Sequence, residues 1–258
     1  KQATDFFSKE WNTKVNIGKV DITLFSRIYL EDVLIHDLSD KRLVSIRSLE
    51  LLIQGFGAQH LTLDEVILEK GEVWVYAEKP TGEMNFQFIA DYFASEDTTS
   101  TSSKFTLALN KITLKQTKLR YDDFRIPKMK TGLDFNHVAL ENVNLTVSEF
   151  INDGPLTAFS LDDFHTKDQS GLWVKGLKAK VAINDTGLRL NSVYIKLNRS
   201  EIHASEIAYS YTDLSALKDF NNKVIFNIAI QPSSINLADV AFFVPEMHGM
   251  NEQVQLSG

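Results

Sequence analysis

With 258 residues, 43% of them hydrophobic, the chain is too apolar to be disordered and long enough for one large β domain or two ordinary ones. Its 34 acidic and 27 basic residues give a net charge of −7 without a lysine and arginine run that could track phosphates, so no nucleic-acid partner is expected. The absence of cysteine excludes disulfides, zinc–thiolate sites and thiol nucleophiles.

A short helix is predicted at the start of the chain, within residues 1–12. Phe6, Phe7 and Trp11 share one side of it. No apolar run approaches the ~20 residues of a membrane span, and the first residue is lysine rather than methionine. We therefore expect that something precedes this chain, either a targeting segment or the rest of a longer protein.

Residues 30–35, Leu-Glu-Asp-Val-Leu-Ile, predict a kinked strand. Successive side chains of a strand alternate between its faces, so Leu30 and Val33 would point to opposite sides of a flat ribbon. A bulge that absorbs the one extra residue would keep Leu30, Val33 and Ile35 on one face and bend the strand.

The same apolar-x-x-apolar-x-apolar hexad recurs six times after residue 30. The further copies begin at residues 46, 63, 109, 135, 140 and 190. These irregular intervals differ from the near-constant period of a leucine-rich repeat or a parallel β-helix. They predict a mainly β fold, a sheet of mostly antiparallel, strongly bent strands linked by hairpins.

The first predicted sheet section, residues 13–95, holds further strands and a second helix. Strands are predicted at residues 44–53, 61–68 and 73–76, with a turn at residues 70–71. The spacing of Phe86, Ile89 and Phe93 predicts an amphipathic helix near 84–94, with Asn85 as its N-cap.

A polar stretch divides this section from the rest of the chain. Residues 96–103 contain no apolar side chain, so 96–104 is predicted to be a mobile loop and an internal boundary. The second section, 105–258, is predicted to be mostly strands, with a weak helical segment at 213–220 and a helical turn at 236–242. Its strand pattern is cut off at the C-terminal end, so the chain is interpreted as one elongated groove segment of a longer protein.

Catalytic patterns are absent, and we expect no enzyme activity, metal or cofactor. The six histidines are far apart, and neither a phosphate-binding glycine loop nor a Gly-x-Ser-x-Gly occurs. Three acidic pairs could in principle serve acid–base chemistry, and a cryptic hydrolase is the minor hypothesis. Their interpretation as solvated residues of bends and turns is preferred; they are Glu31-Asp32, Asp122-Asp123 and Asp162-Asp163.

The aliphatic residues of the hexads form the candidate site. If each bend keeps its two arms facing the same way, they line one concave face. The pattern alone favours a face that closes on itself as a sandwich core, and the alternative is an open trough that holds lipid tails. The predicted groove residues are Leu30, Val33, Ile35, Leu49, Leu51, Leu63, Val66, Leu68, Leu109, Ile112, Leu114, Val138, Leu140, Val143, Leu145, Leu190, Val193 and Ile195, with Ile46, Ile53 and Phe135 beside them.

Four stretches carry a family resemblance: residues 11–22, 30–37, 84–93 and 232–258. In them the chain resembles the N-terminal region of the TamB family, the translocation and assembly proteins of the AsmA-like group of bridge-like lipid transfer proteins, in the form found in Bacteroidetes. The resemblance lies in the amino-acid sequence of these stretches, which contain no catalytic signature.

The resemblance implies a β-taco-like fold, in which an elongated bent sheet forms an open apolar groove. It implies a periplasmic protein that is anchored in the inner membrane by an N-terminal helix, missing here. A C-terminal region, also missing, would engage an Omp85-type outer-membrane protein such as TamA. The implied function is a conduit that shields phospholipid acyl chains between the inner and outer membranes; the alternative is a structural or chaperone-like module for outer-membrane β-barrel assembly.

Overall fold

The computed structural model describes residues 2–23, 26–57, 60–95, 106–153, 156–213, 216 and 223–258. The chain divides into two compact units, and we describe each by itself. The first contains residues 1–130 and 134–143, and the second contains residues 131–133 and 144–258. The boundary loop predicted at 96–104 lies outside the described residues and stays a prediction, as does the helical segment at 213–220 for most of its length.

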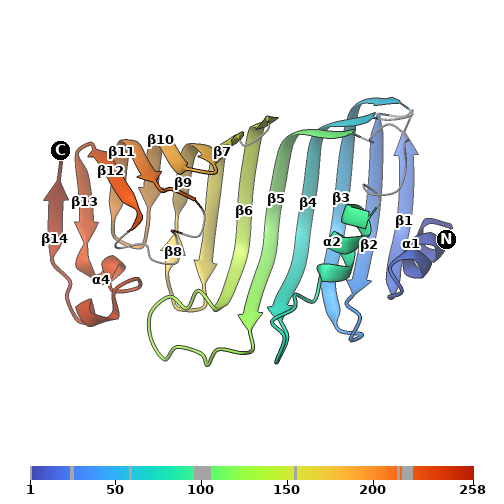
Figure 1. Cartoon of the computed structure of the whole chain (residues 1–258), viewed down its shortest axis with the longest axis horizontal. Helices are drawn as coiled ribbons and strands as arrows, with labels where there is room; N and C mark the ends of the chain where they lie inside the picture. Colours follow the sequence, from blue (N-terminus) through green and yellow to red (C-terminus); the bar gives the residue numbers. More distant parts are fainter. Residues whose placement is uncertain are drawn as a thin grey trace. The chain divides into compact units, whose positions relative to one another are not determined.

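The chain is mainly β, as the sequence predicts (Figure 1). Within the described residues, 14 strands join in one mixed sheet in the order β1-β2-β3-β4-β5-β6-β7-β9-β10-β11-β13-β14, with β8 on β7 and β12 on β11. Strands β1 and β14 stand at opposite ends of this order, so the sheet is not closed.

The strands of the first unit are long. They are β1 (Val15–Thr23), β2 (Arg27–His36), β3 (Arg42–Gly57), β4 (His60–Ala77) and β5 (Thr106–Asp123). Strand β6 (His137–Asp153) contributes residues to both units. The second unit continues with β7 (Leu156–Asp168), β8 (Trp173–Val174), β9 (Gly176–Asn184), β10 (Gly187–Lys196), β11 (Glu201–Ser210), β12 (Ile225–Ile230), β13 (Ser233–Asn236) and β14 (Gln253–Leu256).

Neighbouring strands are mostly antiparallel, as predicted, but β4 and β5 are parallel. Strands β1 to β4 pair antiparallel in sequence, as do β9, β10 and β11. Strand β5 runs parallel to β4, because the chain passes through helix α2 (Gln87–Ser95) before β5 begins. A parallel pair requires such a crossover, whereas a hairpin always reverses the chain.

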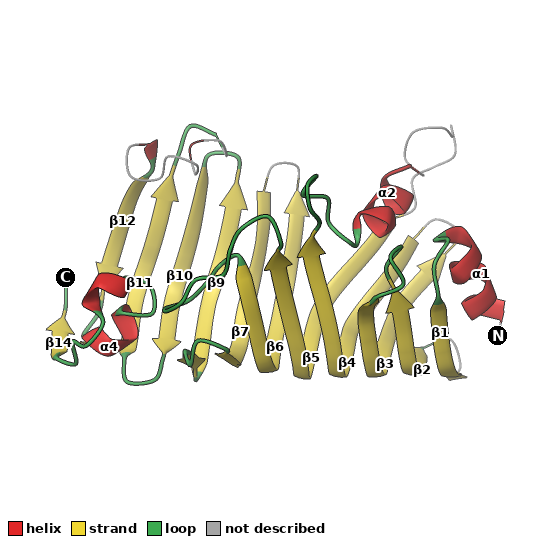
Figure 2. Ribbon diagram, turned by 90° about the horizontal axis from the view of Figure 1, so that it is seen from below, coloured by secondary structure: helices red, strands yellow, loops and turns green. Residues whose placement is uncertain are grey.

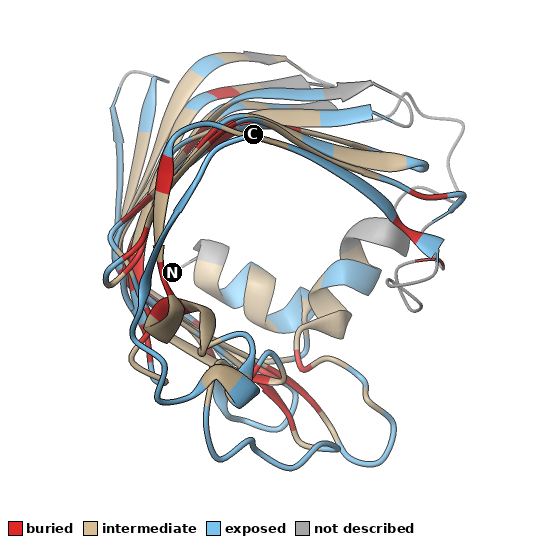
Figure 3. Ribbon diagram, turned by 90° about the vertical axis from the view of Figure 1, so that its left-hand side faces the viewer, coloured by how far each residue is buried: buried red, intermediate tan, exposed pale blue. Residues whose placement is uncertain are grey.

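Three of the hexads show a backbone kink, and the one in β10 also shows the register shift of a bulge against β9. Asp32, Asn142 and Ser192 each occupy the third hexad position and have φ values of 53°, 52° and 53°. In β10, Leu190 and Ile195 pack against the same cluster as Val193, so the bulge at Ser192 keeps both arms on one face. Figure 3 shows curved strands from the side.

The turn predicted at residues 70–71 is wrong, because β4 continues through it. Lys70 has a φ of 52° inside the strand, and Gln116 has a φ of 51° in β5. The parallel register aligns the two kinks, since Glu69 pairs with Lys115 and Glu72 with Lys118. A Cβ on Gly71 would lie 2.4 Å from Leu68 Cδ2, so a larger residue there would displace the end of the Leu68 side chain. Because β4 is hydrogen-bonded to β3 on one side and to β5 on the other, residues 70–71 form a bend inside a continuous strand and not a turn.

Two helices lie on the concave side of the first unit's strands (Figures 2 and 3). Helix α1 (Gln2–Glu10) and α2 occupy the predicted places. The ring centroids of Trp11 and Tyr92 lie 6.4 Å apart. The prediction that Asn85 caps α2 is wrong. Its Oδ1 accepts from the Tyr76 backbone N–H and its Nδ2 donates to the Trp74 carbonyl, so its polar atoms serve strand β4.

The C-terminal part of the second unit contains two short helical segments. Helix α4 (Leu237–Val240) forms within the predicted turn at 236–242, and Asn236 Oδ1 caps it by accepting from the Ala238 N–H. The 3₁₀ helix η2 (Pro245–Met247) follows.

Candidate functional site: an apolar sheet face in each unit

In the first unit, hydrogen-bonded register lines up aliphatic side chains across five strands. Directly opposite residues of a ladder point to the same face of a sheet. One row runs through Val20, Leu30, Leu49, Leu68 and Leu114. The next row runs through Ile22, Ile28, Leu51, Val66 and Ile112. The sheet face is therefore aliphatic from β1 to β5 without interruption along either row.

The other face of the same strands is covered by ion pairs. Residues that alternate with the rows form cross-strand pairs, and those that carry opposite charges are Lys19–Glu31 (3.9 Å), Arg27–Glu50 (2.6 Å), Lys111–Glu65 (3.0 Å), Lys115–Glu69 (2.6 Å) and Lys118–Glu72 (3.6 Å). All of these pairs are partly exposed to water. The sheet thus has one face suited to solvent and one that is not.

The aliphatic face is only partly covered. Val33, Ile46 and Leu63 are buried, with 6%, 7% and 6% of their surface exposed. In β1, by contrast, Val20 and Ile22 are 44% and 60% exposed. The remaining predicted groove residues on β2 to β5 are half-buried; they are Leu30, Ile35, Leu49, Leu51, Val66, Leu68, Leu109, Ile112 and Leu114. The sandwich core favoured by the pattern alone is wrong, because the described strands belong to a single unclosed sheet.

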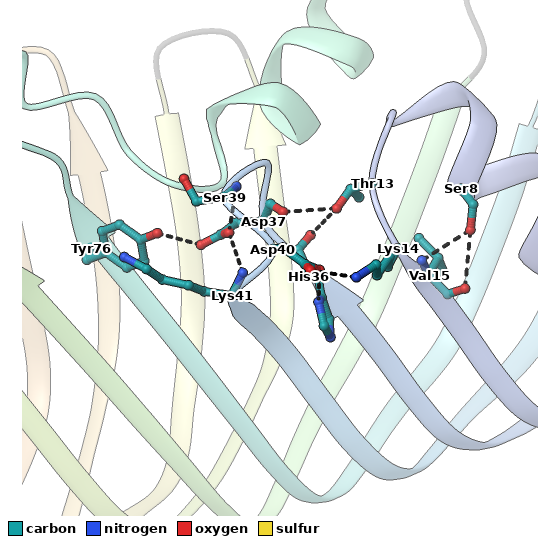
Figure 4. Close-up of polar contacts among 10 residues, drawn as sticks. All are labelled: Ser8, Thr13, Lys14, Val15, His36, Asp37, Ser39, Asp40, Lys41 and Tyr76. Atoms are coloured by element: carbon teal, nitrogen blue, oxygen red, sulfur yellow. Dashed lines mark hydrogen bonds and ion pairs between the residues drawn. The ribbon is translucent and has the colours of Figure 1, made fainter.

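A polar network around Asp37 fixes one end of this face (Figure 4). Asp37 is 2% exposed; its Oδ1 accepts from the backbone N–H groups of Ser39 and Lys41, both at 2.9 Å. Its Oδ2 accepts from the Tyr76 hydroxyl at 2.6 Å and from Asn85 Nδ2 at 3.4 Å. Burial raises the pKa of Tyr76, and the neighbouring Asp37 carboxylate raises it further. The β2–β3 turn is therefore held firmly to β4.

The same turn holds the N-terminal segment (Figure 4). Thr13 Oγ1 donates to the His36 carbonyl at 2.9 Å. Asp40 contacts Lys14 Nζ at 2.5 Å and His36 Nδ1 at 2.8 Å. The bond from Lys14 and then the bond from His36 lower the pKa of Asp40. These contacts place α1 and β1 beside β2, which adds β1 to the aliphatic rows.

The second unit has an aliphatic face of its own. One register row joins Phe159, Val181, Leu190, Ile207 and Ile228 across β7, β9, β10, β11 and β12. The buried cluster on this face contains Ala179, Val181, Val193 and Ala204. The structure therefore brings together the predicted groove residues Leu190, Val193 and Ile195. On β6, Val138, Leu140 and Val143 belong to the first unit and Leu145 to the second; Val143 is fully buried, and the other three are half-buried.

Several residues of these faces are missing from the predicted groove. Val20 and Ile22 belong to a simple alternating strand, and Val181 and Ile207 do as well. The only sequence signal for these residues is the alternation of apolar and polar side chains, whereas the predicted groove was built from the hexads. The interpretation of Phe135 as a groove residue is wrong. Phe135 is 64% exposed and precedes β6, because Asp134 accepts backbone N–H bonds that hold the chain in a loop.

The interpretation of Asp122-Asp123 as solvated residues is wrong, because both side chains are buried. Asp122 is 2% exposed and accepts from Trp74 Nε1 at 3.0 Å and Arg120 Nε at 2.6 Å. Asp123 is 3% exposed and forms a two-pronged pair with Arg125, which lowers its pKa to about 2. Both carboxylates are thus engaged in ion pairs at the end of β5.

His137 completes this cluster. Its Nδ1 lies 3.1 Å from Asp122 Oδ1, and its Nε2 lies 2.8 Å from the Ile126 carbonyl oxygen. Both neighbours are acceptors, so a doubly protonated ring satisfies both. Burial lowers the pKa of His137, but the bonds to the Ile126 carbonyl and to Asp122 outweigh it, and the net direction is upward.

No helix in the described part of the chain is long and apolar enough to cross a membrane. Among the described residues, no group of three or more His, Asp or Glu side chains is arranged to hold a metal ion. The chain matches no protein-family model and no curated protein sequence.

Proposed function

We propose that the aliphatic faces hold phospholipid acyl chains and that the chain is a conduit segment between two membranes. The observation that carries this proposal is the first unit's pair of five-residue aliphatic rows, half-exposed on one face of a sheet whose other face is ionic. Contiguous exposed apolar surfaces on soluble proteins often mark binding sites.

The energetics fit a lipid tail. Burial is worth about 0.8 kcal/mol per methylene, so a sixteen-carbon chain gains at most about 12 kcal/mol by leaving water. Five strands at a spacing of ~4.8 Å make each row roughly 19 Å long. An extended acyl chain that lies along a row therefore contacts apolar side chains over most of the length of the acyl chain. Neighbouring rows are chemically alike, so a tail can shift between them at little cost while its headgroup stays in water.

The resemblance to the TamB family extends this proposal to the whole protein. We propose a periplasmic location, an inner-membrane anchor that precedes the chain, and an Omp85-type partner such as TamA that engages a region following it. In this proposal the protein moves phospholipid between the inner and outer membranes and performs no catalysis.

Photocrosslinking tests lipid binding directly. A benzophenone amino acid at Leu49 or Val66 reports on the aliphatic rows, and the same residue at Ser48 reports on the ionic face one position away. We expect phospholipid adducts, identified by mass spectrometry of the purified protein, from the first two sites and not from Ser48. The absence of adducts at both row positions, under conditions that label a known lipid conduit, would refute the proposal.

A charge placed in a row provides the functional test. Leu49→Glu adds a carboxylate between Leu30 and Leu68 and should strongly reduce co-purifying lipid, because a desolvated carboxylate is costly beside a tail. The control Ser48→Glu adds the same charge to the opposite face and should retain lipid. Thermal unfolding checks that both variants fold. Equal lipid content in the two variants would contradict an acyl-chain site on this face.

The second candidate function is a structural or chaperone-like module for outer-membrane β-barrel assembly. Strand β12 favours it, because Ile225 is 76% and Phe226 is 61% exposed, and the strand carries no charged side chain that would discourage pairing. Under this function, Leu49→Glu would leave barrel assembly intact in cells, and substitution in β12 would impair it.

A further inference from the structure

The loop between β5 and β6, residues 124–136, exposes three large apolar side chains and buries its one acidic side chain. Figure 1 shows it extending beyond the ends of both strands. Ile126, Met129 and Phe135 are 41%, 49% and 64% exposed. Asp134, by contrast, is 8% exposed, and Asp123 directly before the loop is 3% exposed. A loop solvated in the ordinary way would show the reverse distribution.

Specific bonds impose this orientation. Asp134 Oδ2 accepts from the Met129 backbone N–H at 2.7 Å, and its Oδ1 accepts from the Asn136 N–H at 3.0 Å. The Ile126 carbonyl oxygen lies 2.8 Å from His137 Nε2, and the Ile126 N–H donates to the Asp123 carbonyl at 3.1 Å. The backbone at Ile126 is thereby bonded to β5 and β6, and the backbone at Met129 is held within the loop by Asp134. The exposed side chains project from a well-anchored base.

The loop also differs from the chain in charge. Residues 124–136 contain Arg125, Lys128 and Lys130 against Asp134 alone, which gives +2 in a chain of −7, although Arg125 is paired with Asp123 of β5, directly before the loop. Both oxygens of the Asp134 carboxylate accept hydrogen bonds from backbone N–H groups. The Lys128 side chain is 57% exposed, although its Nζ lies 3.7 Å from Asp122, and Lys130 is exposed as well. Lysine therefore alternates with apolar side chains on the outer surface of the loop.

We propose that this loop binds the surface of a bilayer that contains anionic phospholipid. Ile126, Met129 and Phe135 enter the headgroup–acyl boundary, and Lys128 and Lys130 lie among the phosphates. Amphipathic segments that combine basic and large apolar side chains bind such surfaces through both contributions. An acidic protein would complement the lysines but would leave three exposed apolar side chains unexplained. The proposal goes beyond the conduit, since it does not require the aliphatic rows to hold lipid.

Fluorescence can detect insertion without background labelling, because the chain has no cysteine. Met129→Cys carries an environment-sensitive dye on the loop, and Lys115→Cys carries it on the ionic face of β5. With vesicles of equal parts phosphatidylglycerol and phosphatidylcholine, we expect a blue shift at position 129 and none at 115. Vesicles of phosphatidylcholine alone should give a smaller shift. Equal shifts at both positions would overturn insertion of the loop.

Co-sedimentation with the same vesicles measures the contribution of the side chains. The triple variant Ile126→Ser, Met129→Ser, Phe135→Ser should bind at least about tenfold more weakly than wild type. The control Ile225→Ser, Phe226→Ser removes comparably exposed side chains from β12 and should bind normally. Lys130→Glu should weaken binding and reduce its salt dependence.

Two outcomes would overturn the proposal in this assay. One is wild-type protein that stays in the supernatant with both vesicle types, and the other is a triple variant that binds as tightly as wild type. The variant Leu49→Glu separates this proposal from the conduit. It should lose co-purifying lipid and still bind anionic vesicles.

Discussion

Ser192 allows the bent-strand argument to be tested at a single backbone position. Its φ of 53° lies in the left-handed region, which costs an L residue roughly 1–2 kcal/mol. The side chain is exposed, so a substitution alters backbone preference and very little packing. Asn191 pairs with Glu206 and Val193 with Ala204, so Ser205 lies opposite Ser192 in the neighbouring strand. Ser205 is the matched control, because its φ is not positive.

The magnitude follows from these conformations. Ser192→Gly relieves the strain but adds unfolded-state entropy worth about 0.4–1 kcal/mol, so its net effect should lie between zero and about 1 kcal/mol of stabilisation. Ser192→Val places a branched Cβ at positive φ and should lose about 1–2 kcal/mol. The two variants should differ by about 2 kcal/mol, or roughly 4–8 °C in melting temperature.

Thermal unfolding followed by circular dichroism measures this difference. The control Ser205→Val removes the 3.3 Å bond from Ser205 Oγ to the Ala229 carbonyl but meets no positive φ, so it should lower the melting temperature less than Ser192→Val does. Our explanation of the bend fails if Ser192→Val melts at or above the wild-type temperature. It also fails if valine is equally damaging at positions 192 and 205.

Three further outcomes follow from the polar clusters. Tyr76→Phe removes the 2.6 Å bond to buried Asp37 and should cost about 1.5–3 kcal/mol in urea unfolding; an unchanged midpoint would contradict this. The raised pKa of His137 means that its stabilisation is complete below about pH 6.5 and is lost as pH rises through the folded-state pKa. Stability should therefore decline across that range in wild type more than in His137→Gln, and parallel curves would exclude the effect. The pKa of Asp123, lowered to about 2 by Arg125, gives stabilisation that is present above about pH 4 and lost toward pH 2; Arg125→Met should flatten this acid limb of the unfolding curve.

The candidate site was predictable within single strands but not across them. The hexads placed Leu190, Val193 and Ile195 on one face of β10, and the buried cluster shows them there. They could not show that Leu30 lies opposite Leu49, because the partner of a strand and its register depend on residues far away in the chain. Val20 joined the rows only through β1–β2 pairing.

Buried polar groups were hidden from the sequence for a related reason. An Asp at the end of a strand looks like a solvated turn residue unless its partners are known. Asp122 becomes buried because Trp74, Arg120 and His137 converge on it from three separate segments. Asn85 likewise has the position of an N-cap, but its amide binds the neighbouring strand, which offered backbone groups that needed partners.

The amino-acid sequence by itself determined three of the bends, at Asp32, Asn142 and Ser192, together with the two N-terminal helices and the mainly β class, because these depend on local periodicity. Only the tertiary structure decided that β4 continues through Lys70, that β5 runs parallel to it, and that separate hexads meet in aliphatic rows. A period of two specifies which side chains share a face of one strand. Which strands lie beside it is a non-local choice, made by the packing of the whole sheet.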